Sequence, residues 1–235
     1  MRSEYTHITV LTDRSGSMGI IKDDAEGAVN EFVKDQKKVE GDCTFHLWDF
    51  DAPGFGSPSE QNWLNDVFQG PISKAPTYKL EPRGNTALLD AAAATIRDTG
   101  KFLDAMPEDQ RPAKVIFVIQ TDGQENSSRE TTWEALAETI KTQQEKFNWE
   151  FVFLGMGLDT FKQGERLGIK NVTQSASDGV AYGSTYSVLS ANTTAMRTNK
   201  ADSMRAMNMT VDAQGKAWDA DGNEIDPRTG NKVTA

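Results

Sequence analysis

The chain has 235 residues, of which 35 are Asp or Glu and 25 are Lys or Arg, so its formal net charge is -10. This length is sufficient for one large domain with a full core and an appendage. Because acids predominate and no cluster of Lys and Arg stands out, nucleic acid and anionic membrane surfaces are poor candidate partners.

The N-terminal residues contain no apolar segment of the kind found in signal peptides, and no later apolar run is long enough to cross a bilayer. We therefore expect a cytoplasmic protein, which for a phage-encoded chain means the host cytoplasm or the virion. Cys43 is the only cysteine, so no intrachain disulfide is expected. Its place at the start of an apolar strand predicts a buried small hydrophobe.

The first half of the chain alternates between strand and helix patterns. An apolar, β-branched strand leads into residue 13, and apolar residues at helical spacing predict a first helix between residues 21 and 39. Residues 43–50 predict a second strand. Residues 66–72 predict an edge strand, because Pro71 has no N–H for a central ladder.

The second half continues the alternation. A continuous apolar run at residues 114–121 is typical of a central parallel strand with both faces covered. The remaining expected elements are a helix from Leu88 to Leu103, a helix at residues 133–147, a strand at 151–155, a short helix at 159–168, a short strand at 171–174 and a closing helix at 178–199. The sequence thus predicts a Rossmann-like, doubly wound α/β domain, with a mostly parallel sheet, one antiparallel edge strand and helices on both faces.

The composition changes at about residue 200, and we predict a boundary between an α/β domain at 1–199 and a C-terminal extension at 200–235. Two similar turn sequences around residues 212–216 and 219–223 predict a turn-rich extension that is flexible or forms hairpins. Asp219, Asp221 and Asn223 also resemble half of a calcium loop. That interpretation is weaker, because the bidentate Glu and the flanking helices are missing.

Oxygen-bearing side chains occur in three loops that the alternating pattern brings to one edge of the sheet. Asp13, Ser15 and Ser17 follow the first strand, Thr86 precedes the second main helix, and Asp122 follows the central strand. Ligands of open α/β sheets bind beyond the carboxyl ends of the strands. Because these loops offer no His or Cys, the pattern excludes a zinc-type site and favours Mg²⁺ or Mn²⁺.

The sequence here resembles the von Willebrand factor type A (VWA) family with its metal-ion-dependent adhesion site, over roughly residues 5–199. The motif is Asp-x-Ser-x-Ser, a distant Thr, and an Asp that opens Asp-Gly, and all five positions are filled in order. The resemblance implies that Ser15, Ser17 and Thr86 bind the cation directly, and that Asp13 and Asp122 bind it largely through water. It also implies that a Glu or Asp carboxylate of a partner protein completes the coordination.

Each residue has a simpler alternative role. In this alternative, the first helix is capped by Asp13, Ser15 or Ser17 and the second helix by Thr86, and Asp122 only starts an Asp-Gly turn. Glu125 either lines the rim of the site or is an exposed loop acid.

We therefore predict a non-enzymatic, Mg²⁺-dependent protein-binding module, similar to stand-alone bacterial and phage members of the family. The alternative is a structural or assembly component, for instance of a phage particle, that docks through residues 200–235. A metal-dependent phosphohydrolase is the least favoured hypothesis, because His7 and His46 lie in predicted strands. Asp49-Phe50-Asp51 has the Asp-x-Asp spacing of phosphatases, but it lacks the following Thr.

Overall fold

The computed structural model describes residues 1–52, 62–157, 159–176, 178–201, 207–226 and 231–233. Its described residues form one sheet with the strand order β3-β2-β1-β4-β5-β6-β7-β8-β9. The strands are β1 (Arg2–Asp13), β2 (Cys43–Phe50), β3 (Leu64–Pro71), β4 (Pro112–Thr121), β5 (Glu150–Met156), β6 (Asn171–Ser175), β7 (Met209–Val211), β8 (Ala217–Trp218) and β9 (Glu224–Ile225).

The sheet is mixed but mostly parallel, which confirms the predicted fold class. Neighbouring strands from β2 through β1, β4, β5 and β6 to β7 are parallel. β3 pairs with β2 in the antiparallel direction and lies at one edge, the position that Pro71 predicted. At the other edge, β8 and β9 add two antiparallel strands from the C-terminal extension.

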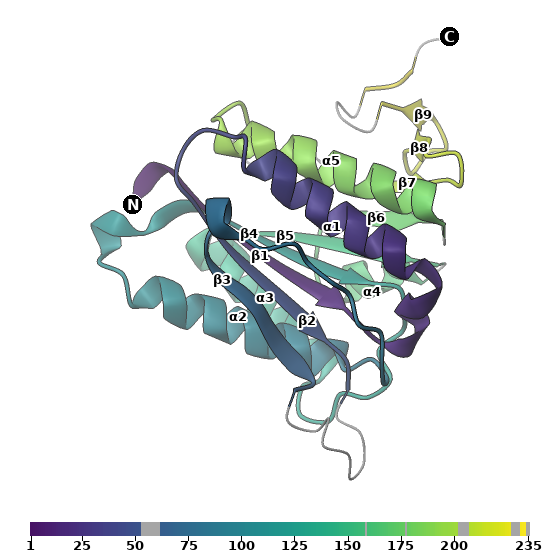
Figure 1. Ribbon diagram of the computed structural model, residues 1–235, viewed down its shortest axis with the longest axis horizontal. Coiled ribbons are helices and arrows are strands. Elements are labelled where there is room, and N and C mark those ends of the chain that lie inside the picture. Colours follow the sequence, from purple (N-terminus) through teal and green to yellow (C-terminus); the bar gives the residue numbers. More distant parts are fainter. Residues whose placement is uncertain (53–61, 158, 177, 202–206, 227–230, 234–235) are drawn as a thin grey trace.

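Helices cover both faces of this sheet (Figure 1). The short 3₁₀ helix η1 (Gly16–Ile21) leads into α1 (Lys22–Gln36), which packs beside α5 (Gly179–Arg197) over one face. The opposite face carries α2 (Leu88–Asp104), α3 (Trp133–Phe147) and α4 (Thr160–Arg166). Two further 3₁₀ helices are η3 (Ile72–Lys74) and η4 (Glu108–Gln110). Each face therefore has its own apolar core.

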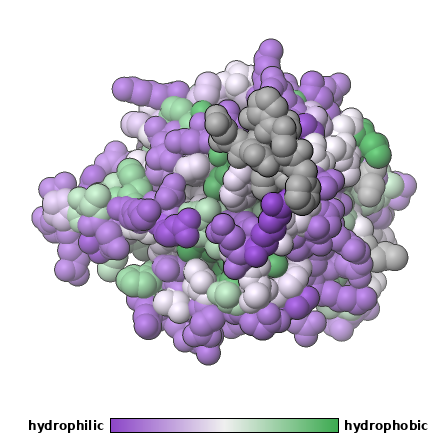
Figure 2. Space-filling model, turned by 90° about the horizontal axis from the view of Figure 1, so that it is seen from below, coloured by the Kyte–Doolittle hydropathy of each residue, from purple (hydrophilic) through white to green (hydrophobic). Residues whose placement is uncertain are grey.

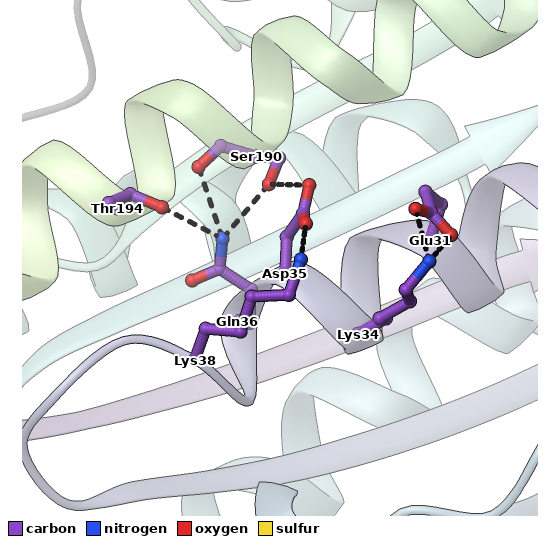
Figure 3. A network of polar contacts seen from close by, with 7 residues as sticks. All are labelled: Glu31, Lys34, Asp35, Gln36, Lys38, Ser190 and Thr194. Carbon is purple, nitrogen blue, oxygen red and sulfur yellow. Dashed lines mark hydrogen bonds and ion pairs between the residues drawn. The ribbon is translucent and has the colours of Figure 1, made fainter.

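Polar side chains fix the register between α1 and α5 (Figure 3). Gln36 Nε2 donates to Ser190 O at 3.1 Å, to Ser190 Oγ at 3.2 Å and to Thr194 Oγ1 at 3.1 Å. Arg197 Nη1 donates to Gln36 O at 2.5 Å from the same helix. The Ser and Thr residues of α5 are unfavourable for an isolated helix, but here they supply interhelical hydrogen bonds.

The two histidines are buried in the sheet, as predicted. His7 in β1 is 0% exposed and His46 in β2 is 2% exposed, and their ring centroids lie 4.5 Å apart. His7 Nδ1 lies 2.7 Å from Thr44 Oγ1 and His7 Nε2 lies 3.0 Å from Thr9 Oγ1, so both ring nitrogens are used within the fold.

The C-terminal extension is continuous with the α/β sheet. β7 pairs with β6, and Met207, Met209 and Val211 are buried in the core beneath α5. The turns after β7 and β8 form hairpins, in which the carboxylates of Asp212 and Asp219 accept backbone N–H groups. A boundary at residue 199 stays a prediction, and the described part of the extension contributes both strands and core residues.

No helix in the described ranges combines the length and apolarity that a membrane span requires.

Figure 2 shows a face on which hydrophilic side chains predominate and apolar side chains form small, scattered patches.

Candidate metal centre

The three loops that carry the predicted ligands meet at the carboxyl edge of the sheet. Asp13 ends β1, and Asp122 follows the last residue of β4, whereas Thr86 lies two residues before α2. β1 and β4 are adjacent and parallel, with Thr12 opposite Gln120, so their ends are neighbours. The central position of these two strands therefore places the first and third loops side by side.

Four of the five predicted ligands form a compact group of oxygens. Ser15 Oγ lies 3.1 Å from Ser17 Oγ, and Ser17 Oγ donates to Asp122 Oδ1 at 2.9 Å. A Cβ atom at Gly123 would lie 3.4 Å from Thr86 Oγ1 and 3.8 Å from Ser17 Oγ. Gly123 thus lies next to both hydroxyls, which places Thr86 beside Ser17.

Asp13 lies directly behind this group. Its Oδ1 accepts the backbone N–H of Ser15 at 2.6 Å, and its Oδ2 accepts the hydroxyl of Thr121 at 2.6 Å. The carboxylate therefore ties the first loop to the end of β4. The structure brings all five predicted residues to one place.

Burial differs across the group and sets its electrostatics. Asp13, Ser15 and Thr86 are at most 3% exposed, whereas Ser17 is exposed and Asp122 is half-buried. Burial raises the pKa of Asp13 to about 6, although hydrogen bonds from Thr121 and Ser15 partly oppose this shift. Burial also raises the pKa of Asp122. The group therefore combines two carboxyls whose pKa values are raised by burial with one exposed hydroxyl, that of Ser17.

The alternative capping roles are wrong. Ser15, which precedes η1, makes no side-chain capping bond, and the N-cap of α2 is Ala87 instead of Thr86. The first turn of α2 is capped from another loop, because Leu89 N donates to Glu125 Oε2 at 3.0 Å and Asp90 N donates to Ser128 Oγ at 3.1 Å.

Glu125 is half-buried, and its hydrogen bonds join two loops of the site. In addition to Leu89 N, its carboxylate accepts the N–H groups of Ser127 at 2.8 Å and Ser128 at 2.7 Å. The carbonyl of Thr86 accepts two N–H groups from the same segment, those of Asn126 and Ser127. Glu125 therefore holds the Thr86 loop against the loop that carries Asp122.

A buried ion network that the sequence did not predict lies next to the site. Arg14, at a variable position of the Asp-x-Ser motif, is 6% exposed, and its Nη1 lies 2.8 Å from Asp49 Oδ1. Its Nε lies 3.5 Å from Asp51 Oδ2, which also pairs with Arg83 Nε. The available signal was the pair of acids at the end of an apolar strand, because buried carboxylates require a basic partner.

This network and the backbone around it connect the first two loops. Arg83 N donates to Arg14 O at 2.8 Å, and Gly16 N donates to Gly84 O at 3.0 Å. Asp49 and Asp51 are almost fully buried and form ion pairs with Arg14 and Arg83. These ion pairs explain why two acids with phosphatase-like spacing follow one another at the end of β2.

The calcium-like turn is also explained by local hydrogen bonds. Asp219 Oδ1 accepts the backbone N–H groups of Asp221 at 3.0 Å and Asn223 at 2.8 Å, and the Asn223 amide donates to both carboxylate oxygens. In the described part of the chain, no three His, Cys, Asp or Glu side chains are grouped so that they could hold a metal ion.

Solved structures similar to this one share its fold at low sequence identity. The pilus adhesin SpaC from Lactobacillus rhamnosus GG aligns with a TM-score of 0.61 and 16% identity, over 85% of this chain and 31% of that chain. A von Willebrand factor type A protein from Catenulispora acidiphila aligns with a TM-score of 0.55 and 16% identity, over 90% of this chain and 44% of that chain.

This chain has the VWA fold. A third similar structure, proximal thread matrix protein 1 from the mussel byssus, was solved with zinc in its metal-ion-dependent adhesion site. It aligns with a TM-score of 0.52 and 14% identity, over 79% of this chain and 45% of that chain. The chain thus spans less than half the length of these VWA structures. No protein-family model and no curated protein matches the sequence.

Proposed function

We propose that this VWA-fold chain is a non-enzymatic protein-binding module that holds Mg²⁺ or Mn²⁺ and uses it to bind a carboxylate of a partner protein. The oxygen cluster of Ser15, Ser17, Thr86 and Asp122 carries this proposal. In our assignment the three hydroxyl residues ligate the cation directly, and Asp13 and Asp122 act largely through water.

The spacing of the oxygens supports a small octahedral cation. Mg²⁺ binds oxygen at about 2.1 Å, so adjacent ligands of an octahedron lie about 3.0 Å apart. The separation of Ser15 Oγ from Ser17 Oγ, two of the assigned direct ligands, is 3.1 Å and fits this edge length. When bound, the cation would supply a positive charge that neutral hydroxyls leave largely uncompensated, and a carboxylate is its complement.

Several features support binding over catalysis. Burial raises the pKa of Cys43 to about 11, so its thiol is protonated at neutral pH and is a poor nucleophile. His7 and His46 are buried within the sheet. Asp49 and Asp51 are paired with arginines, so they are not available as a free base.

The direct test is thermal unfolding in Mg²⁺ and in EDTA. For a dissociation constant of about 1 mM, about 10 mM Mg²⁺ stabilises the fold by roughly 1.4 kcal/mol. We therefore expect the midpoint to rise by roughly 3 to 6 °C. Ser17→Ala should remove this rise without unfolding the protein, because the Ser17 side chain is exposed.

A matched control is Ser187→Ala, which removes an exposed hydroxyl that bonds only within α5, to Gly183 O. This variant should keep the full Mg²⁺ response. If the unaltered protein shows no shift at any concentration of Mg²⁺ or Mn²⁺, the proposed metal site is refuted.

A further inference from the structure

The 3₁₀ helix η1 has one buried face and one exposed face. In a 3₁₀ helix, side chains three residues apart eclipse each other. Met18 and Ile21 form the buried face, at 0% and 4% exposure. Ser17 and Ile20 have the same three-residue spacing and form the exposed face, where Ile20 is 89% exposed.

Ile20 is the most exposed large hydrophobic side chain among the described residues, ahead of Met1, Val180, Phe147 and Val233. A single exposed apolar residue is common on proteins and by itself indicates nothing. Its position does carry an inference, because Ile20 shares a helix face with Ser17, whose hydroxyl reaches Asp122 Oδ1 at 2.9 Å. An apolar side chain therefore stands next to the proposed metal position.

The dimensions of η1 indicate how a bound segment would use this side chain. Three residues of a 3₁₀ helix rise about 6 Å along its axis. In an extended peptide, residues two apart point to the same face and lie about 7 Å from each other. A carboxylate on the cation and an apolar side chain on Ile20 therefore match two residues at positions i and i+2 of one extended segment.

We propose that the partner of this protein presents an extended segment in which an Asp or Glu and an apolar residue are separated by one residue, and that Ile20 is the specificity-determining contact for the apolar one. This inference rests on the proposed function, because the cation supplies the binding site for the acid. The attraction between the cation and the carboxylate sets the position of the segment. Burial of Ile20 against the segment gives the preference for an apolar residue two positions from the acid.

The test is a titration of the ¹⁵N-labelled protein with three capped peptides in about 10 mM Mg²⁺, in which binding is monitored by nuclear magnetic resonance. The peptides are Gly-Glu-Ser-Leu-Gly, the reversed Gly-Leu-Ser-Glu-Gly, and Gly-Glu-Ser-Ser-Gly, which lacks the apolar residue. At least one leucine peptide should bind about tenfold more tightly than the serine peptide, because leucine and Ile20 shield each other from water.

The variant Ile20→Ser should bind all three peptides equally, because the apolar contact is gone while the metal ligands remain. Phe147→Ser is the matched control, since Phe147 is 56% exposed and ends α3 at the opposite edge of the sheet. This control should keep the tenfold preference.

The outcomes separate this inference from the proposed function. Equal Mg²⁺-dependent binding of the three peptides to the unaltered protein, or a leucine preference that survives Ile20→Ser, overturns the role of Ile20 and leaves the metal-dependent module in place. If none of the peptides binds, or if binding persists in EDTA, the proposed function fails and the inference fails with it.

Discussion

Replacing Arg14 by methionine is expected to lower the free energy of unfolding by about 3 to 5 kcal/mol, the usual cost of leaving a buried charge without its partner. Arg14 lies 2.8 Å from Asp49 and 3.5 Å from Asp51, and these two acids are at most 3% exposed. Methionine fills similar space but cannot compensate the Asp49 carboxylate. At this chain length the midpoint of thermal unfolding should fall by about 10 °C.

The double variant Arg14→Met with Asp49→Asn should recover part of this loss, because it removes the uncompensated charge as well. Lys101→Met is the control, since Lys101 is 70% exposed and lies 3.8 Å from Asp98, and it should change the midpoint little. A loss below about 1 kcal/mol for Arg14→Met would show that the network contributes no more than a surface pair.

Replacing Asp13 by asparagine should have opposite effects on stability and on metal binding. Burial raises the pKa of Asp13 to about 6 from an ordinary value of 3.8. At pH 7.5 the ionised carboxylate therefore destabilises the metal-free fold by about 3 kcal/mol relative to low pH. Asparagine carries no charge and keeps one oxygen for the N–H of Ser15, so the metal-free variant should be more stable than the parent. The stabilisation by Mg²⁺ should disappear.

The pH dependence of this difference has a defined sign. Between about pH 4 and pH 6 the folded parent holds a proton on Asp13 that the unfolded chain has lost, so its stability falls as the pH rises. The advantage of Asp13→Asn in EDTA should therefore be small at pH 4 and grow until about pH 7. Denaturant unfolding at several pH values measures it.

Glu108→Gln provides the reference for this experiment, because Glu108 is an exposed acid of η4. Its difference from the parent should not follow the same pH course. If Asp13→Asn is less stable than the parent at pH 7.5 without metal, the two hydrogen bonds at Asp13 outweigh the cost of its buried charge, and the expected trade-off between stability and binding is wrong.

The sequence was most informative where the hydrophobic period and the motif coincide. The continuous apolar run before Asp122 predicted the central strand β4, and the β-branched run before Asp13 predicted its neighbour β1. Because parallel strands end at the same edge, the positions of Asp13 and Asp122 along the chain were enough to predict that they meet, and Thr86 was placed with them by the family motif.

The capping roles in this region could not be predicted from local signals. Thr86 has the residue type of an N-cap, yet Glu125 and Ser128, more than 35 residues away, cap α2. A cap provided across space leaves no i to i+3 signature in the sequence. The same holds for the extension, where Met207 and Met209 are buried only because β7 pairs with β6.

By itself the sequence determined the alternation of strands and helices up to residue 199 and the candidate set of oxygen ligands, because hydrophobic period and residue type are local properties. The tertiary structure alone decided three further features: the pairing of Arg14 with the acids at the end of β2, the link from Glu125 to α2, and the exposure of Ile20 beside Ser17. The first two depend on which distant segment packs against the residue, and the third depends on which face of η1 is buried, the one with Met18 and Ile21. These are fixed only when the sheet and its helices come together.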